Sequence, residues 1–432
     1  MVSNLLNTLA RVGIIALLAR IYARDEFGIW VAITSATAIL ATSDFGMGNA
    51  LRNKLAALAV RGKTGNDEAR EYFLSVFYFF LIAALVLSAG LLIVSRFIPL
   101  QMLFKTSDVA LQRAGADILI AVQVIFLIGI PLGIGPTMFF AYQESAWNAA
   151  FSLANGLISA IVVCGLALMG QSIVTTAIWY FVAGLLVTTA GTAVFLHRRR
   201  WNPLRVTLRL ILPRVWSLLS LSLRFAAVQI SGAFIYNAAT LVTCATISVA
   251  DAAEYNLVQK LYGFALGLYL SVYNPLWAGY TDAVHRGDWD WCQKTLKLTL
   301  VLTAAIFTGM AIAFTFFGNF FLQVLAGKGY VSQPSLFALL GLWVLFYILW
   351  SCVMAFLIAV ERINIMMALM LICAIIFVPI SGMLGQRFGI VGIAASSVLV
   401  FAPLAILGYI QSFWIVRRAR PASSITQNSE RV

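Results

Sequence analysis

A basic segment in the middle of the chain constrains the fold more than any other feature. It holds six arginines between Arg198 and Arg214 and separates two long stretches of almost continuous apolar sequence. Each arginine would cost about 2.5–3.5 kcal/mol at the centre of a membrane-spanning helix. We therefore expect this segment to lie on the cytoplasmic side of a membrane and to connect two membrane-embedded halves.

Composition excludes a soluble protein. Of the 432 residues, 62% are hydrophobic and only 10% are charged, which leaves too little polar surface for a water-exposed fold. The five cysteines show no paired spacing, so we expect no disulfide framework, no metal site and no cofactor. The net charge of +13 is typical of the positive-inside bias of membrane-protein loops and does not indicate nucleic-acid binding.

Apolar runs predict twelve transmembrane helices in two lobes of six around a central cavity, an all-α polytopic membrane protein. Four short motifs recur in the same order in both halves, for example Arg61-Gly62 and Arg286-Gly287. An even number of spans per repeat gives two copies with the same orientation. The predicted spans are 2–23, 27–58, 72–94, 116–142, 146–169, 173–195, 218–247, 254–284, 296–321, 336–360, 363–384 and 390–416. The predicted divisions are an N-terminal lobe (1–197), a basic connector (198–217), a C-terminal lobe (218–418) and a disordered tail (419–432).

The first two spans carry polar residues at helical spacing. In the second span a stripe of small and polar residues runs from Trp30 through Asp44 to Arg52, and such a face should look into protein or water. The first span carries Arg11, which either snorkels to the interface or lines a cavity. This span is short beside its counterpart, so we expect a start upstream of Met1 or a truncated first helix. Helix packing around a buried ion pair is the alternative interpretation of the second-span stripe.

The seventh and eighth spans repeat this theme with hydroxyl and aromatic groups. Arg224 lies near the inner end of the seventh span, and Lys260 lies within the eighth. Tyrosine stripes usually serve packing, but they can also stack on sugars and hydrogen-bond their hydroxyls. Glycines and prolines between Pro131 and Pro136 should interrupt the fourth span. The fifth and sixth spans have few features and are interpreted as scaffold. The tyrosines considered for binding are Tyr236, Tyr262, Tyr269 and Tyr273.

Counting lysines and arginines in the loops favours a topology with both chain ends in the cytoplasm. The two predicted lobes would then enclose a cavity with several cations, Arg11, Arg52, Arg224 and Lys260, and one central acid, Asp44. Such a cavity favours an anionic ligand, and the aromatic and hydroxyl stripes favour sugars.

The residues 23–30 (ARDEFGIW) and 43–51 (SDFGMGNAL) resemble the opening of Wzx-type polysaccharide flippases of the multidrug/oligosaccharidyl-lipid/polysaccharide (MOP) superfamily. The resemblance implies a bacterial inner-membrane flippase that moves undecaprenyl-diphosphate-linked oligosaccharide by alternating access, for surface polysaccharide synthesis. It implies that the four cations hold diphosphate or acidic sugars and that Asp44 is a candidate for ion coupling. Partners would be membrane lipid, a polysaccharide polymerase and a chain-length regulator. Asn237 stands where many relatives have an aspartate, which puts ion coupling through the seventh helix in doubt.

Two other functions remain open from the sequence. A multidrug antiporter of the same superfamily would need acids in its lobes, whereas the expected cavity has more bases than acids. A membrane polymerase or ligase would need a large outer loop with catalytic residues, but the longest outer loop, about 95–113, offers Asp108 and no histidine. We therefore expect a transporter, not an enzyme.

Overall fold

The structure is a computed structural model that describes residues 2–42, 46–204 and 208–429. It divides into two compact units, Met1–Ala253 and Glu254–Val432, which are described separately below. Side chains at 2–9, 63–64, 208, 220–229, 264–265, 267–268, 270–275 and 420–429 lie outside the described part.

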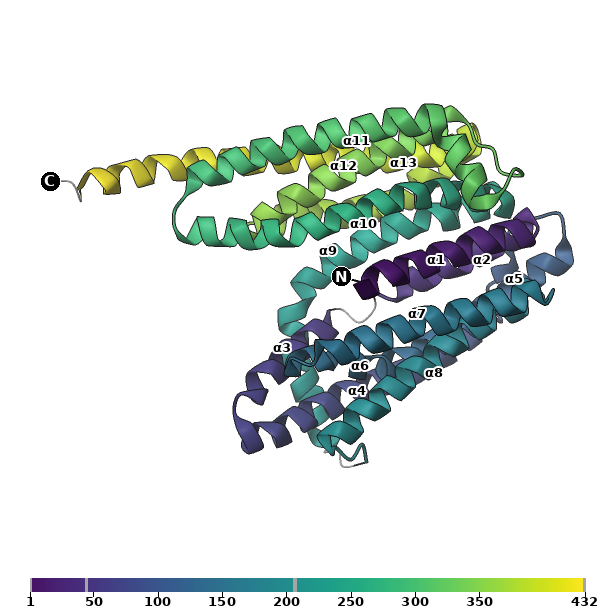
Figure 1. The fold of residues 1–432 in the computed structure, drawn as a ribbon, viewed down its shortest axis with the longest axis horizontal. Coiled ribbons are helices and arrows are strands. Elements are labelled where there is room, and N and C mark those ends of the chain that lie inside the picture. Colours follow the sequence, from purple (N-terminus) through teal and green to yellow (C-terminus); the bar gives the residue numbers. More distant parts are fainter. Residues whose placement is uncertain (1, 43–45, 205–207, 430–432) are drawn as a thin grey trace. The chain divides into compact units, whose positions relative to one another are not determined.

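The described chain is helical throughout, which confirms an all-α polytopic membrane protein (Figure 1). Seven helices are long and apolar enough to span a membrane, and Ile230–Thr246 is a shorter apolar stretch. The elements are α1 (Val2–Ile21), α2 (Arg24–Leu40), α3 (Met47–Ala59), α4 (Gly62–Val94), η1 (Leu100–Leu103), α5 (Val109–Leu132), α6 (Ile134–Met138), η2 (Phe139–Tyr142), α7 (Ser145–Leu168), α8 (Ile173–Arg199), α9 (Leu208–Thr246), α10 (Val249–His285), α11 (Trp289–Ala326), α12 (Pro334–Ala359) and α13 (Asn364–Ser429).

Two of the predicted spans are each divided into shorter helices, and for the fourth span its glycines and prolines predicted this interruption. The second span consists of α2 and α3, and Gly46 adopts a left-handed conformation with φ 70° immediately before α3. The fourth span consists of α5, α6 and η2, with Pro131 inside the last turn of α5 and a break at Gly133. With α13 divided at Gly389, where φ is 62°, the described chain forms twelve helical spans.

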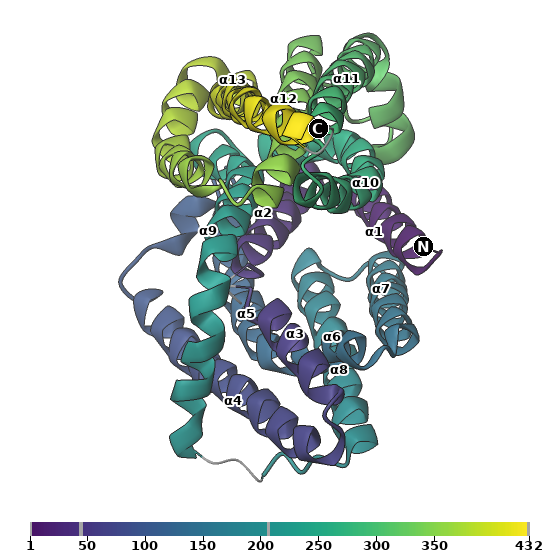
Figure 2. The same cartoon turned by 90° about the vertical axis from the view of Figure 1, so that its left-hand side faces the viewer.

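Short helices α3 and α6 lie among the long helices of the first unit (Figure 2). Helix α3 contacts α4, α6 and α9, while α6 contacts α7 and α8. Gly135 on α6 allows close approach to α8, because a Cβ there would lie 2.5 Å from Thr192 Cα. The Gly135 amide also donates to Thr192 Oγ1 at 3.1 Å. These contacts fix the interrupted fourth span in the interior of the unit.

The basic connector is shorter than predicted, because α9 begins at Leu208 instead of near Leu218. Ile211, Val215 and Leu218 are buried in an apolar cluster with residues of α3, α4 and α8. Their spacing of four and three residues places them on one face of a helix. Apolar burial therefore extends the helix through a segment whose arginines had suggested a loop.

Ion pairs hold this basic region against neighbouring helices of the first unit. Arg199 Nη2 lies 2.6 Å from Glu144 Oε1, and its guanidinium lies 3.7 Å from the Tyr142 ring centroid. Arg214 pairs with Glu71 on α4. Each of these two arginines is largely shielded from solvent, so both ends of the basic region are packed against other helices.

The boundary between the compact units falls after α9, whereas the sequence suggested a lobe boundary at the connector. Helix α9 packs against α2, α3 and α4, and Val249 lies against Gly28 on α2. Packing thus groups the seventh span with the first unit. The sequence-based lobes remain a prediction about the repeats.

One backbone feature recurs in both predicted repeats. Gly62 follows the second span with φ 66°, and Gly287 follows the eighth span with φ 71°. This similarity supports a repeat.

Helix α12 forms the core of the second unit. In its most apolar window 67% of the residues are buried, compared with 11% in α11. It packs against both α11 and α13. Gly341 permits this approach, because a Cβ there would lie 2.5 Å from Ala311 Cβ and 2.8 Å from the Tyr262 hydroxyl.

The two arms of α13 form a hairpin that turns at Gly389. Cys373 Sγ lies 3.9 Å from the Val400 carbonyl, and Gln411 Nε2 donates to the Arg362 carbonyl at 3.0 Å. Beyond the hairpin α13 extends to Ser429, and the disordered tail over 419–432 remains a prediction.

Candidate functional site

A cavity of about 460 Å³ lies inside the first unit, within the size range of small-molecule sites in proteins. It is enclosed by α3, α4, α5, α6, α7 and α8, and Ala41 adds to its wall. Its described lining holds neither a basic nor an acidic side chain. The lining consists of Ala41, Gly48, Asn49, Phe80, Ile125, Phe126, Gly129, Ile130, Gly133, Ile134, Thr137, Asn155, Ser159, Tyr180, Phe181, Gly184, Leu185 and Thr188.

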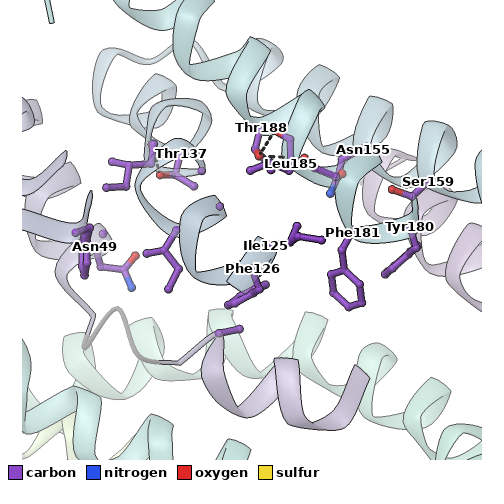
Figure 3. A pocket seen from close by; sticks show the side chains of 18 residues that line it. Asn49, Ile125, Phe126, Thr137, Asn155, Ser159, Tyr180, Phe181, Leu185 and Thr188 are labelled. Carbon is purple, nitrogen blue, oxygen red and sulfur yellow. Dashed lines mark hydrogen bonds between the residues drawn. The ribbon is translucent and has the colours of Figure 1, made fainter. Parts of the chain in front are cut away.

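Amide and hydroxyl groups reach the cavity from several helices (Figure 3). Asn49 on α3 and Thr137 on α6 lie on one side, and Asn155 and Ser159 on α7 lie on the other. Thr137 and Thr188 donate to carbonyls of their own helices, which leaves their hydroxyl oxygens able to accept from a ligand. The described wall of the cavity is therefore mainly apolar, with a few amide and hydroxyl groups and no charged side chain.

Asn155 provides the strongest sign that this cavity receives a ligand. Its Oδ1 is buried and has no hydrogen-bond partner among the described residues. Leaving a buried acceptor unsatisfied costs about 1–3 kcal/mol. A hydroxyl or amide donor in the cavity would remove that cost once the Asn155 side chain rotates this oxygen away from Gly184 on α8.

Aromatic rings line the same cavity. Tyr180 lies edge-on to Trp30 with ring centroids 5.2 Å apart, and Tyr180 and Phe181 are 4.9 Å apart. Phe126 and Phe181 both line the cavity (Figure 3). Aromatic faces beside amides and hydroxyls form a surface suited to sugars, or to an amphipathic molecule with polar groups.

Part of the predicted second-span stripe serves packing instead of lining this cavity. Thr37 Oγ1 accepts from Gln123 Nε2 on α5 at 3.0 Å, and Thr34 donates to the Trp30 carbonyl at 2.9 Å. Farther along, Gly48 and Asn49 do line the cavity. The stripe therefore combines a packing contact with a binding surface.

Arg52 lies one helical turn beyond Gly48 on α3, and so on the same side of that helix. It is half-buried, and its guanidinium carbon lies 5.8 Å from the Phe140 ring centroid. No carboxylate of the described residues forms a salt bridge with it. Arg52 is thus the predicted cation that lies nearest in sequence to the cavity lining.

The described lining of this cavity does not include Arg11. Arg11 is exposed on α1, and Lys260 is half-buried on α10 of the second unit with interactions of its own. Asp44 and the side chains of Arg224 and Tyr273 lie outside the described residues. The roles assigned to these five residues remain predictions.

Two of the predicted tyrosines, Tyr262 and Tyr269, make contacts between packed helices. The Tyr262 hydroxyl donates to the Phe337 carbonyl at 2.6 Å, and the Tyr269 hydroxyl lies 2.7 Å from Cys352 Sγ. Both contacts join α10 to α12 within the second unit. Tyr236 is half-buried on α9 and also has interactions, and the Asn237 side chain donates to the Ala233 carbonyl of its own helix at 2.8 Å.

Interpreting the fifth and sixth spans as scaffold overlooked the part of the cavity wall that α7 and α8 form. Asn155 and Ser159 are four residues apart on α7, and Tyr180, Gly184 and Thr188 follow the same spacing on α8. Each set lies on one helix face. That spacing was the available signal, but one or two polar residues in an apolar helix form a weak pattern.

Comparisons with known proteins show the class of fold. No protein-family model matches the chain, and no curated protein sequence matches it. The fold is similar to "Inward-facing conformation of a multidrug resistance MATE family transporter of the MOP superfamily", with a TM-score of 0.74, 12% identity and 96% of each chain covered. It is also similar to "Lipid II flippase MurJ, inward closed conformation", with a TM-score of 0.70, 16% identity and coverage of 96% of this chain and 87% of that one.

A third similar structure is a MOP superfamily transporter from Pyrococcus furiosus, whose title reports a reversed polarity of its binding pocket. The TM-score is 0.57 at 13% identity, with 97% of this chain and 94% of that one covered. This protein is thus a multi-pass membrane protein with the fold of MOP superfamily transporters.

Proposed function

We propose that this protein is a flippase that moves a lipid-linked oligosaccharide, carried on undecaprenyl diphosphate, across a bacterial inner membrane. The neutral cavity with the unpartnered Asn155 acceptor is the observation that carries the proposal. Both chain ends would be cytoplasmic, as the loop charges predict. The cargo would be a repeat unit for surface polysaccharide.

The sugar part of the cargo would occupy the cavity of the first unit. Asn49, Asn155 and Ser159 offer hydrogen bonds, while Tyr180 and Phe126 offer ring faces. Sugars carry many hydroxyls and need such partners when they leave water, because an unsatisfied polar group in a low-dielectric site is costly.

The diphosphate would be held by cations instead of by the described cavity wall. Arg52 is suited to this role, because a guanidinium offers several donors to phosphate oxygens and keeps its charge. Arg11, Arg224 and Lys260 are proposed as further contacts during transport. Cargo would bind with its sugars near α7 and α8 and its phosphates toward Arg52.

A multidrug antiporter is the second candidate, because one similar structure carries that function in its title and the cavity has aromatic walls. Export of a cationic drug would favour an acid in the lining, but the described lining contains none. A drug-binding role would therefore depend on residues beyond those that line this cavity.

Transport in proteoliposomes distinguishes these candidates. The purified chain is reconstituted with a fluorescent undecaprenyl-diphosphate oligosaccharide, and a membrane-impermeant lectin reports cargo that reaches the other leaflet. We expect flipping above protein-free vesicles and no efflux of ethidium. Ethidium efflux without flipping would contradict the flippase proposal and support the antiporter.

A further inference from the structure

The second unit contains a separate apolar groove that the proposed function does not use. It has a volume of about 670 Å³ and is formed by α11, α12 and α13. Helix α12 packs against both other helices and contributes Phe346 and Leu349 to the lining. The groove is lined by Gln293, Lys297, Leu300, Phe346, Leu349, Ala405, Ile406, Tyr409, Ile410, Phe413, Trp414 and Arg417.

The groove faces outward along much of its length. Ile406 is 54% exposed, Ile410 is 60% exposed and Trp414 is 49% exposed, so these apolar side chains face the surroundings of the protein. In a protein that spans a membrane, such a surface contacts lipid. An acyl chain is the natural occupant of its apolar part.

Two cations line the same groove, Lys297 on α11 and Arg417 on α13. Both side chains are exposed, and neither forms a salt bridge with any carboxylate of the described residues. The described lining contains no acid. A headgroup with negative charge would therefore be complementary to this part of the groove.

The dimensions fit one leaflet. From Ala405 to Arg417 the groove follows α13 for about 18 Å at 1.5 Å per residue, while half of a bilayer's hydrocarbon core measures about 15 Å. The loop charges predict that Lys297 and Arg417 lie at the cytoplasmic surface. Trp414 lies one turn before Arg418, whose guanidinium carbon is 3.8 Å from the Trp414 ring centroid, and tryptophan is typical of this interface.

We propose that this groove is a binding site for an anionic glycerophospholipid of the cytoplasmic leaflet, with its phosphate between Lys297 and Arg417. One acyl chain lies along α13 toward Phe346. A second copy of the chain docked symmetrically through this groove would bring like charges together, which disfavours that occupant. The site is independent of the transported cargo.

Native mass spectrometry of the full-length protein in detergent tests the proposal. Phosphatidylglycerol and phosphatidylcholine with identical acyl chains are titrated against wild type and the double variant Lys297→Gln/Arg417→Gln. We expect wild type to prefer phosphatidylglycerol by at least about tenfold. The double variant should bind it on the order of thirtyfold more weakly, since each cation near a membrane contributes to anionic-lipid attraction.

The matched control is Lys294→Gln/Arg362→Gln, which removes two exposed charges from the second unit outside the groove lining. It should retain the phosphatidylglycerol preference within about twofold, and size-exclusion profiles check the folding of all variants. Equal loss in the control, or a preference that survives in Lys297→Gln/Arg417→Gln, would overturn the proposal. Displacement of phosphatidylglycerol by a tenfold lower concentration of undecaprenyl phosphate would overturn the assignment of the occupant.

Discussion

In the first unit, Asn155 and Tyr180 line a cavity of about 460 Å³. In the second unit, Tyr262 donates to a backbone carbonyl, and a Cβ on Gly341 would lie 2.8 Å from its hydroxyl. Both units thus place polar and aromatic side chains on apolar helices. The units differ in whether a neighbouring helix is interrupted. In the first unit the fourth span is interrupted at Gly133, whereas in the second unit α12 is continuous. A break in one helix leaves room that its neighbours can line.

A substitution that crowds the second unit should have the largest effect. Gly341→Leu would place side-chain atoms where Ala311 Cα and the Tyr262 hydroxyl already lie. We expect overpacking to cost about 3 kcal/mol or more and to remove most folded protein. Fluorescence-detected size exclusion measures the loss. Gly129→Ala is the matched change in the first unit, where the nearest atom would be 3.6 Å away, and it should fold normally. Normal folding of Gly341→Leu would show that the second unit is not tightly packed.

Removing the charge near the cavity should affect transport more than folding. Arg52→Ala loses a cation–π contact worth about 0.5–1 kcal/mol, but we expect cargo flipping to fall more than tenfold because the diphosphate loses its partner. Lys260→Ala should also lower cargo flipping. The exposed Arg113 on α5 provides the control Arg113→Ala. Unchanged flipping in Arg52→Ala would remove this residue from the binding site.

Two asparagines on α7 offer a matched test of the cavity itself. Asn155→Leu should lower flipping about tenfold while leaving the thermal midpoint unchanged or raised, because the unsatisfied acceptor is removed. Asn148→Leu should leave flipping unchanged and lower the thermal midpoint. Asn148 Nδ2 donates to the Pro136 carbonyl at 2.9 Å, and loss of this hydrogen bond costs about 1 kcal/mol. If both variants lost stability equally and kept transport, the cavity would be structural.

The smallest effect is expected from Tyr262→Phe. It removes one hydrogen bond between α10 and α12, and such bonds contribute about 0.6 kcal/mol on average within membranes. We expect a slightly lower thermal midpoint and unaltered cargo flipping. A loss of flipping without a change in stability would instead support the ligand role predicted for this tyrosine from its place in the stripe.

Helix existence and helix breaks could be predicted from the sequence, because apolar length and the positions of glycine and proline act locally. Gly46, Pro131 and Gly133 all lie at observed breaks. The start of α9 could not be predicted in this way, since burial of Ile211 and Val215 against other helices overrides the local arginine pattern. Burial of this kind depends on contacts between distant segments.

The candidate site was predictable only in part. The polar stripe of the second span reaches the cavity lining at Gly48, while the role of Arg52 remains a prediction. Asn155 and Tyr180 lie on different helices, and only the fold brings them to one cavity. The hydroxyls of Tyr262 and Tyr269 looked equally suitable in the sequence, but whether a side chain meets a neighbour or open space is not encoded in helical spacing.

The turn at Gly389 connects the last two spans without an intervening loop. A single residue with φ 62° and ψ −149° reverses the chain there, and contacts such as Gln411 to Arg362 join the far ends of the arms. We therefore expect the two arms to move together when the second unit rearranges.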